Sequence, residues 1–190
     1  MKRIMGLTTA FLLLIGMTGI GTWAYFSDVE TATGNVFTAG TLDLKTDDVD
    51  GVSQTLLAAN MTPGGTVGPE TIILKNAGSI DGSTLDLVFT YVDSDSSPNP
   101  ADISADATAA IIQVTTLNYD GESLLGSVSD NNTNGYKDVE DLKNADLSGQ
   151  DTIGALASKE FDIAVMLRSD ADKALQSDGI NITMTFILNQ

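Results

Sequence analysis

Hydrophobic and polar residues alternate along several short stretches of the chain, and this period of two predicts β-strands that bury one face. An apolar run at 71–75 also predicts a strand, and five stretches show the pattern, at 41–45, 84–92, 110–117, 161–167 and 180–188. Gly, Pro, Asn and Asp separate them, as expected of turns. The pattern therefore predicts an all-β sandwich or barrel, in which we expect the last two stretches to pair with each other.

Three stretches between the predicted strands lack this alternation and read as short helical or loop excursions. They are residues 100–109, 138–145 and 170–176. The alternation itself signals burial and carries no chemistry. The sequence shows no internal repeat and no sign of a second large domain.

The N-terminus has the layout of a secretory signal peptide. Lys2 and Arg3 precede an apolar run at 7–20, and small residues follow as far as Ala24. We expect residues 1–24 to be removed on export, which would leave a secreted protein without a membrane segment. A retained anchor and a pilin-like leader are the alternatives, although the latter usually has a glutamate where Phe11 stands.

Composition excludes several kinds of chemistry. The 190 residues include 26 acidic and 9 basic side chains, with no histidine and no cysteine. Disulfide scaffolds, thiol catalysis and histidine-based zinc sites are therefore absent. The formal charge of −17 argues against nucleic acid as a partner and favours cations, because nucleic-acid-binding proteins need lysine and arginine.

The most specific motif is a twelve-residue loop at 130–141 that resembles a calcium-binding loop. Oxygen ligands are expected from its positions 1, 3, 5, 7, 9 and 12, which are Asp130, Asn132, Asn134, Tyr136 (backbone carbonyl), Asp138 and Asp141. Gly135 occupies the sixth position, where the chain must turn sharply. We predict a structural calcium ion here. The alternative is an Asx-rich turn that needs no ion.

Position 12 of this loop departs from the usual pattern. Asp141 replaces the bidentate glutamate, as in the loops of dockerin modules. A second group of carboxylates lies near the first predicted strand and comprises Asp43, Asp47, Asp48 and Asp50. We interpret this group as a solvated acidic loop, because a glycosidase needs two carboxylates that face each other across a cleft.

Four segments resemble the TasA and camelysin family of biofilm fibre proteins. They are AYFSDVETATGNVFTAGTLDL at 24–44, MTPGG at 61–65, LKNAGSI at 74–80 and DGINITMTFILNQ at 178–190. The resemblance spans most of the chain after the signal peptide and is thin in the middle. The calcium-type loop is not part of this family pattern.

The resemblance implies a jelly-roll-like antiparallel β-sandwich at 38–190. It also implies that residues 25–37 form a donor strand, which completes the sandwich of the next subunit, as in the fibres and archaeal bundling pili of this family. Its apolar anchors would be Phe26, Val29, Val36 and Phe37. The alternative is an ordinary edge strand or a free tail.

These features together predict a non-enzymatic subunit of an extracellular or cell-surface filament. Its partner would be further copies of itself, and the filaments could bundle laterally. Two other functions stay open: a monomeric, calcium-stabilised adhesion or carbohydrate-binding module, and a camelysin-like metalloprotease. The protease function conflicts with the absence of histidine.

Overall fold

The computed structural model describes residues 41–50, 53–58, 61–94, 103–172 and 178–190. The expected signal peptide (1–24) and donor strand (25–37) lie outside the described residues, so both stay predictions. No helix in the described ranges is long and apolar enough to cross a membrane.

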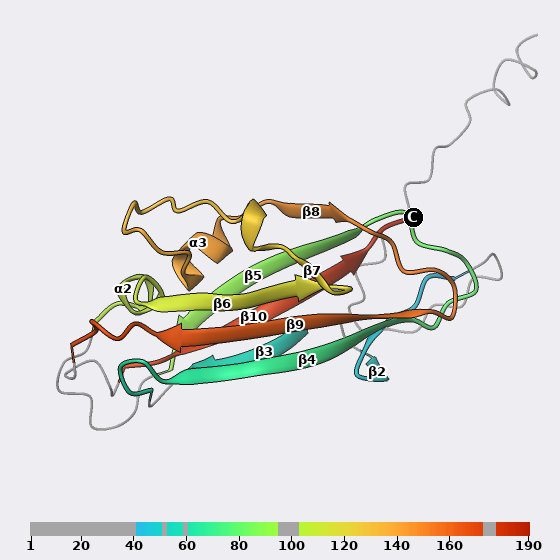
Figure 1. Ribbon diagram of the computed structural model, residues 1–190. Coiled ribbons are helices and arrows are strands. Elements are labelled where there is room, and N and C mark those ends of the chain that lie inside the picture. Colours follow the sequence, from blue (N-terminus) through green and yellow to red (C-terminus); the bar gives the residue numbers. More distant parts are fainter. Residues whose placement is uncertain (1–40, 51–52, 59–60, 95–102, 173–177) are drawn as a thin grey trace, which may run out of the picture.

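Two antiparallel sheets form the protein (Figure 1). The larger sheet has the strand order β2 (Val49–Asp50), β1 (Leu44–Thr46), β4 (Thr66–Asn76), β9 (Ser158–Leu167), β6 (Ile112–Tyr119) and β7 (Glu122–Ser123). The smaller sheet has the order β3 (Ser53–Ala58), β10 (Ile180–Leu188), β5 (Leu85–Asp93) and β8 (Leu147–Gln150). Most connections pass from one sheet to the other, as in a jelly roll, and the predicted all-β sandwich is confirmed.

The core lies between the two sheets and is centred on three aromatic rings. Phe161 of β9 and Phe186 of β10 are fully buried. Their ring centroids lie 5.2 Å apart in an edge-to-face arrangement, and Phe89 of β5 lies 6.2 Å from Phe161. Each ring comes from a strand with strict alternation, so the period of two delivers all three to the same interior.

The expected pairing of residues 161–167 with 180–188 is wrong. Strand β9 pairs with β4 and β6, whereas β10 pairs with β3 and β5 in the opposite sheet. The two strands face each other across the core. Alternation is the same for strands that share a sheet and for strands that face each other, because both bury one face in the same core.

Two of the three predicted excursions are short helices, α2 (Ala105–Ala109) and α3 (Val139–Lys143), and the third falls partly outside the described residues. A 3-10 turn, η1, covers Leu125–Ser127. Both helices lie against β5, and α3 also contacts β6 (Figure 1). They therefore cover the seam where β5 and β6 border each other across the sandwich. On the opposite side, β3 and β4 border each other without a described helix over them.

We expect the aromatic cluster to dominate stability. Phe161→Ala should lower the free energy of unfolding by about 3–5 kcal/mol, because it removes a buried ring and leaves a cavity between the sheets. Val49→Ala, at a side chain that is 65% exposed, is the control and should change it by less than about 0.5 kcal/mol. Urea denaturation measures both, and similar losses in the two variants would contradict this view of the core.

Candidate functional site

The predicted calcium loop connects η1 to α3 and lies on the seam that the helices cover. Thr133 and Gly135 have positive φ angles of 56° and 86°, so the chain reverses direction in the middle of the loop. A side chain at Gly135 would meet no atom within 4 Å, so the glycine is required by backbone conformation and not by space. The sharp turn expected at this position is therefore present.

The first half of the loop is wrapped around the Asp130 carboxylate. Its two oxygens accept hydrogen bonds from the backbone amides of Asn134 (3.1 Å) and Gly135 (2.9 Å). The side-chain oxygen of Asn132 accepts a further bond from the Asn134 amide at 3.1 Å. The side chains of two predicted ligand residues, Asp130 and Asn132, thus point toward the inside of one turn.

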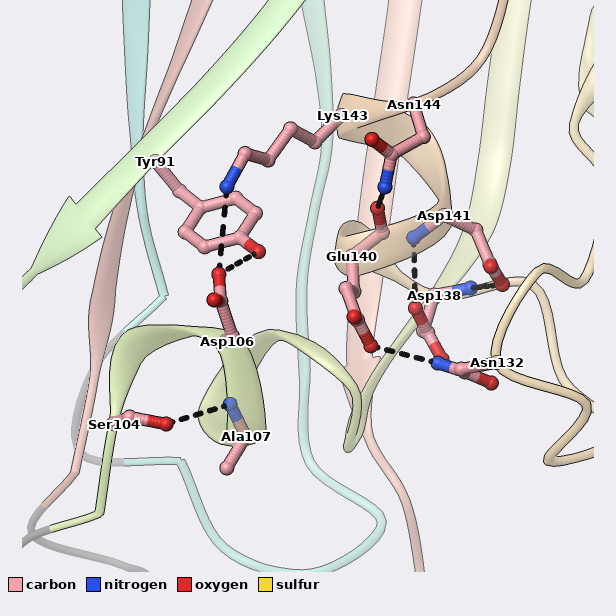
Figure 2. Close-up of polar contacts among 10 residues, drawn as sticks. All are labelled: Tyr91, Ser104, Asp106, Ala107, Asn132, Asp138, Glu140, Asp141, Lys143 and Asn144. Carbon is pink, nitrogen blue, oxygen red and sulfur yellow. Dashed lines mark hydrogen bonds and ion pairs between the residues drawn. The ribbon is translucent and has the colours of Figure 1, made fainter.

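The second half of the loop is the start of α3. Asp138 is the N-cap of this helix, and its Oδ1 accepts the Asp141 amide at 3.0 Å. Asp141 Oδ2 accepts the Asp138 amide at 3.3 Å, and its Oδ1 accepts the Asn131 amide at 2.7 Å (Figure 2). This capping box explains why the helix begins here. Both carboxylates are buried, with 0% and 1% of the residue exposed.

The two halves meet at Asp138 Oδ2. The carboxamide nitrogens of Asn132 and Asn134 donate to this oxygen at 3.0 and 2.7 Å, and the Asn132 nitrogen also donates to Glu140 Oε2 at 2.9 Å. A half-turn of either carboxamide would bring its oxygen to the same place and would break the bond that this oxygen accepts from a backbone amide, Asn134 for Asn132 and Tyr136 for Asn134. Asp130, Asn132, Asn134 and Asp138 are thus brought together, and Asp141 is joined to them through the capping box.

Tyr136 lies at the outer side of the loop. Its amide donates to Asn134 Oδ1 at 2.9 Å, and its ring lies 4.1 Å from the Arg168 guanidinium. No group of three or more Asp or Glu side chains in the described ranges is arranged to hold a metal ion by carboxylates alone. Any ion in this loop must therefore use the carboxamide and backbone oxygens as well, as calcium does.

Charge in the loop is unbalanced. Asp130, Asp138, Glu140 and Asp141 take part in none of the ion pairs between described residues. The nearby cations have other partners: Lys137, within the loop, donates to the Leu125 carbonyl, Lys143 lies 3.4 Å from Asp106, and Arg168 pairs with Asp170 at 2.6 Å. Buried carboxylates without a basic partner are costly unless hydrogen bonds or a metal ion compensate them.

A polar cluster that the sequence does not predict holds α2 and α3 against β5 (Figure 2). The Tyr91 hydroxyl donates to Asp106 Oδ1 at 2.6 Å, and Lys143 lies 4.7 Å from the centre of the Tyr91 ring. Burial, followed by the hydrogen bond to Asp106, raises the pKa of Tyr91. The Tyr91 bond and then the Lys143 ammonium lower the pKa of Asp106 below its ordinary 3.8. The cluster fixes the helix that carries Asp138 and Asp141.

The second candidate site is the seam between β3 and β4. A groove of about 360 Å³ runs along it, with Leu56 of β3, Ile72 of β4 and Met184 of β10 among its lining residues. All three side chains are almost fully buried, so the floor of the groove is apolar. Asp47 and Glu70 lie at its rim.

One edge of β4 is open above this groove. Strand β1 pairs only with Leu74, Lys75 and Asn76, and no described strand pairs with residues 66–73 on that side. Strand β1 ends because Asp47 and Asp48 adopt positive φ angles of 52° and 60° and turn the chain back.

The carboxylates of this turn have structural contacts. The Asp47 amide donates to the Ile73 carbonyl at 2.9 Å, and its side chain accepts the Ile73 amide at 2.9 Å. Asp48 pairs with Lys75 at 2.7 Å, and this hydrogen bond lowers the pKa of Asp48. Asp43 lies 3.9 Å from Lys45. The carboxylates thus serve the turn and do not form a facing acid pair.

The predicted donor residues Phe26, Val29, Val36 and Phe37 lie outside the described residues. Their role stays a prediction. The structure adds the open edge of β4 and the groove beside it. The sequence does not predict them, because β3 (Ser53–Ala58) shows no clear alternation.

Comparison with known proteins gives one match. A family model described as camelysin metallo-endopeptidase matches residues 1–190. No curated protein matches the chain. The family match confirms the resemblance found in the sequence.

Asp106→Asn should make stability less dependent on pH in acid. A carboxyl whose pKa is lowered by folding contributes stability above its ordinary pKa, and this contribution is lost as the pH falls through the folded-state pKa. Below pH 3.8, the wild type should lose more of its unfolding free energy than the variant. Urea denaturation at a series of pH values measures this. Asp151→Asn is the control. If the unfolding free energy of both variants depends on pH to the same reduced extent, a specific role for Asp106 is contradicted.

Proposed function

The chain belongs to the camelysin metallo-endopeptidase family, which is also the TasA family, and on this basis we propose that it is a structural subunit of an extracellular filament. Each copy would complete the sandwich of the next with residues 25–37 and polymerise head to tail. The observation that carries the proposal is the open edge of β4 above an apolar groove.

An open strand edge has backbone groups that an extended peptide can pair with, and an apolar groove beside it gives that peptide's side chains a place to pack. Residues 66–73 of β4 supply such an edge. Pro69 removes one donor, and the Ile73 amide and carbonyl already bond to Asp47, so the stretch from Glu70 to Ile72 offers the most regular pairing. Leu56, Ile72 and Met184 supply the apolar floor.

The proposed donor has suitable length and chemistry. Twelve extended residues from Phe26 to Phe37 span about 40 Å, which exceeds the roughly 26 Å of the open edge. Phe26, Val29, Val36 and Phe37 are apolar, and the TATG sequence between them is a poor independent strand. A segment of this composition gains order mainly by pairing with an existing sheet.

The geometry favours exchange between copies. Thr41 lies beside Ser79, with the Ser79 amide 2.9 Å from the Thr41 carbonyl, so the chain approaches β1 from the Asn76 end of β4. The open edge lies toward the opposite end, at Thr66. A donor that leaves one end and an acceptor at the other give a heterologous contact, which propagates into a filament.

We propose further that the loop at 130–141 holds a structural calcium ion. The ligands would be the side-chain oxygens of Asp130, Asn132, Asn134, Asp138 and Asp141 and the carbonyl of Tyr136. Calcium supplies positive charge and accepts six to eight oxygens. The buried and otherwise unbalanced carboxylates of Asp138 and Asp141 support this choice. Binding would hold α3 and the β5–β6 seam in place.

The protein would act outside the cell and without catalysis. The family description names an endopeptidase, whereas this chain has no histidine for the usual zinc site of such enzymes. A protease assay of the purified protein, with and without chelator, distinguishes the two functions. Chelator-sensitive cleavage that co-purifies with the chain would favour the enzyme.

Deletion of residues 26–37 should abolish filaments and leave a soluble monomer with unchanged β-sheet content. The reason is that the acceptor edge of each copy then has no strand to receive. Negative-stain electron microscopy and circular dichroism measure the two properties.

A variant of unchanged length sharpens this test. Phe26, Val29, Val36 and Phe37 are replaced by serine, and the control replaces the polar residues Thr31, Thr33 and Asn35 by serine. The first variant should fail to polymerise and the control should form normal filaments. Normal filaments from the deletion variant would refute donor-strand exchange.

Calcium should raise the melting temperature of the wild type and have little effect on Asp130→Asn. At a free concentration of one hundred times its Kd, a ligand stabilises the folded state by about 2.7 kcal/mol. Asp130→Asn keeps the shape of the side chain and removes charge from the first ligand position. Differential scanning fluorimetry over a calcium titration measures the shift.

Asp146→Asn is the matched control, since Asp146 is exposed and its carboxylate accepts local hydrogen bonds from the Ser148 amide at 3.2 Å and the Ser148 hydroxyl at 2.6 Å. Its response to calcium should equal that of the wild type. Magnesium should stabilise less, because it demands a smaller octahedral site. A wild type that melts at the same temperature in calcium and in chelator would remove the ion from the proposal.

A further inference from the structure

Part of the outer face of the smaller sheet carries no charged side chain, and Asp86 lies just beyond it on β5. We call this part the neutral face and define it as the outward-facing residues at 55–57 of β3, 88–92 of β5 and 181–185 of β10. One row across it is Leu57, Asn181 and Val92, which are neighbours in the strand register. The next row is Thr55, Thr183 and Thr90.

Hydrophobic side chains are concentrated on this face. Leu57 (54% exposed), Val88 (46%) and Val92 (61%) are three of the six large hydrophobic residues that are exposed in the described part of the chain. Val88 lies opposite Thr185 in the register, so it forms the third row. The face is therefore a regular array of β-branched and apolar side chains, which is a surface that packs well against another sheet.

The outer face of the larger sheet is different. There, Glu160 lies opposite Ile73, and Asp162 lies opposite Thr71 and accepts its hydroxyl at 2.6 Å. In a chain with a formal charge of −17, two copies repel each other wherever acidic surfaces meet. The neutral face is the extended sheet surface on which this repulsion is weakest.

We propose that the neutral face is a lateral contact surface for the neutral face of a second copy of this chain. The contact is isologous, with each row of one copy packed against a row of the other. A second copy fits better than a glycan, because the outward-facing residues that define this surface include no aromatic ring for a sugar to stack on.

The contact overlaps the β3–β4 groove of donor-strand complementation only on β3, where Thr55 and Leu57 also line that groove, and its rows on β10 and β5 lie outside the groove's lining at Asn181, Thr183 and Thr90. A stable complex buries roughly 800 Å² per partner, or about 20–30 residues a side, and the neutral face has far fewer outward-facing residues, so isolated copies should associate weakly. Copies fixed in a filament present the face repeatedly, and repetition strengthens the association without any new contact. The expected consequence is side-by-side packing of filaments.

Thr90→Lys tests the proposal, because it places a charge in the middle row of the face, on β5. The substitution also makes the whole chain less acidic, so an effect of net charge alone would increase association. Burial of an unpaired ammonium in a face-to-face contact should instead weaken association by at least about tenfold. Ser158→Lys makes the same change of charge on the exposed outer face of the larger sheet and is the matched control.

Two readouts of the full secreted chain separate this proposal from the proposed function. Electron microscopy gives the width of filament bundles, and sedimentation velocity over a concentration series gives the association of copies that are not in filaments. Circular dichroism verifies that each variant is folded. Raised salt screens the acidic surfaces and should strengthen the wild-type contact.

The proposal predicts bundles from the wild type and from Ser158→Lys, and single filaments from Thr90→Lys. If no variant forms filaments, donor-strand exchange fails, but the sedimentation series still tests the face. Equal or stronger association of Thr90→Lys would overturn the lateral contact. A wild type that stays monomeric at every concentration of protein and salt would also overturn the lateral contact, even if it binds an added polysaccharide.

Discussion

The proposed filament depends on one physical constraint. The backbone amides and carbonyls of a β-strand need hydrogen-bond partners on both sides of the strand. Strand β4 satisfies this through β9 along one edge, but β1 covers only three residues of the other. The early end of β1 follows from the left-handed turn at Asp47 and Asp48, which reverses the chain into β2 on the other side of β1. A sandwich with such an edge and an apolar groove beside it has a place for one more strand.

The opposite seam is closed from within the chain. There α2 and α3 lie against β5, held by the contacts of Tyr91 and Lys143 with Asp106. The same closure buries Asp138 and Asp141 in a loop whose acidic residues form no ion pair with any described residue. A bound cation would offset this charge, so stability of the closed seam and metal binding would be linked. Without cysteine, an exported domain has no disulfide to provide such a brace.

The sequence predicts those parts of the fold and of the candidate site that depend on residues close together in the chain. Alternation at 84–92 and 180–188 predicted β5 and β10 within a residue or so, and the break in alternation at 138–145 predicted the excursion that contains α3. Partnership between strands could not be predicted, because β9 and β10 bury the same kind of face toward one core. The Tyr91 cluster joins residues from three distant elements that only the fold brings together. The acceptor groove was missed because it arises from where β1 stops.

The most direct test of the central claim is a cryo-electron microscopy map of the filament at a resolution that identifies side chains. The account predicts an extended strand along residues 66–73 of β4, with side chains that match Phe26, Val29, Val36 and Phe37 of the adjacent subunit. A map in which those residues fold back onto their own sandwich, or in which the edge of β4 stays bare, would contradict it.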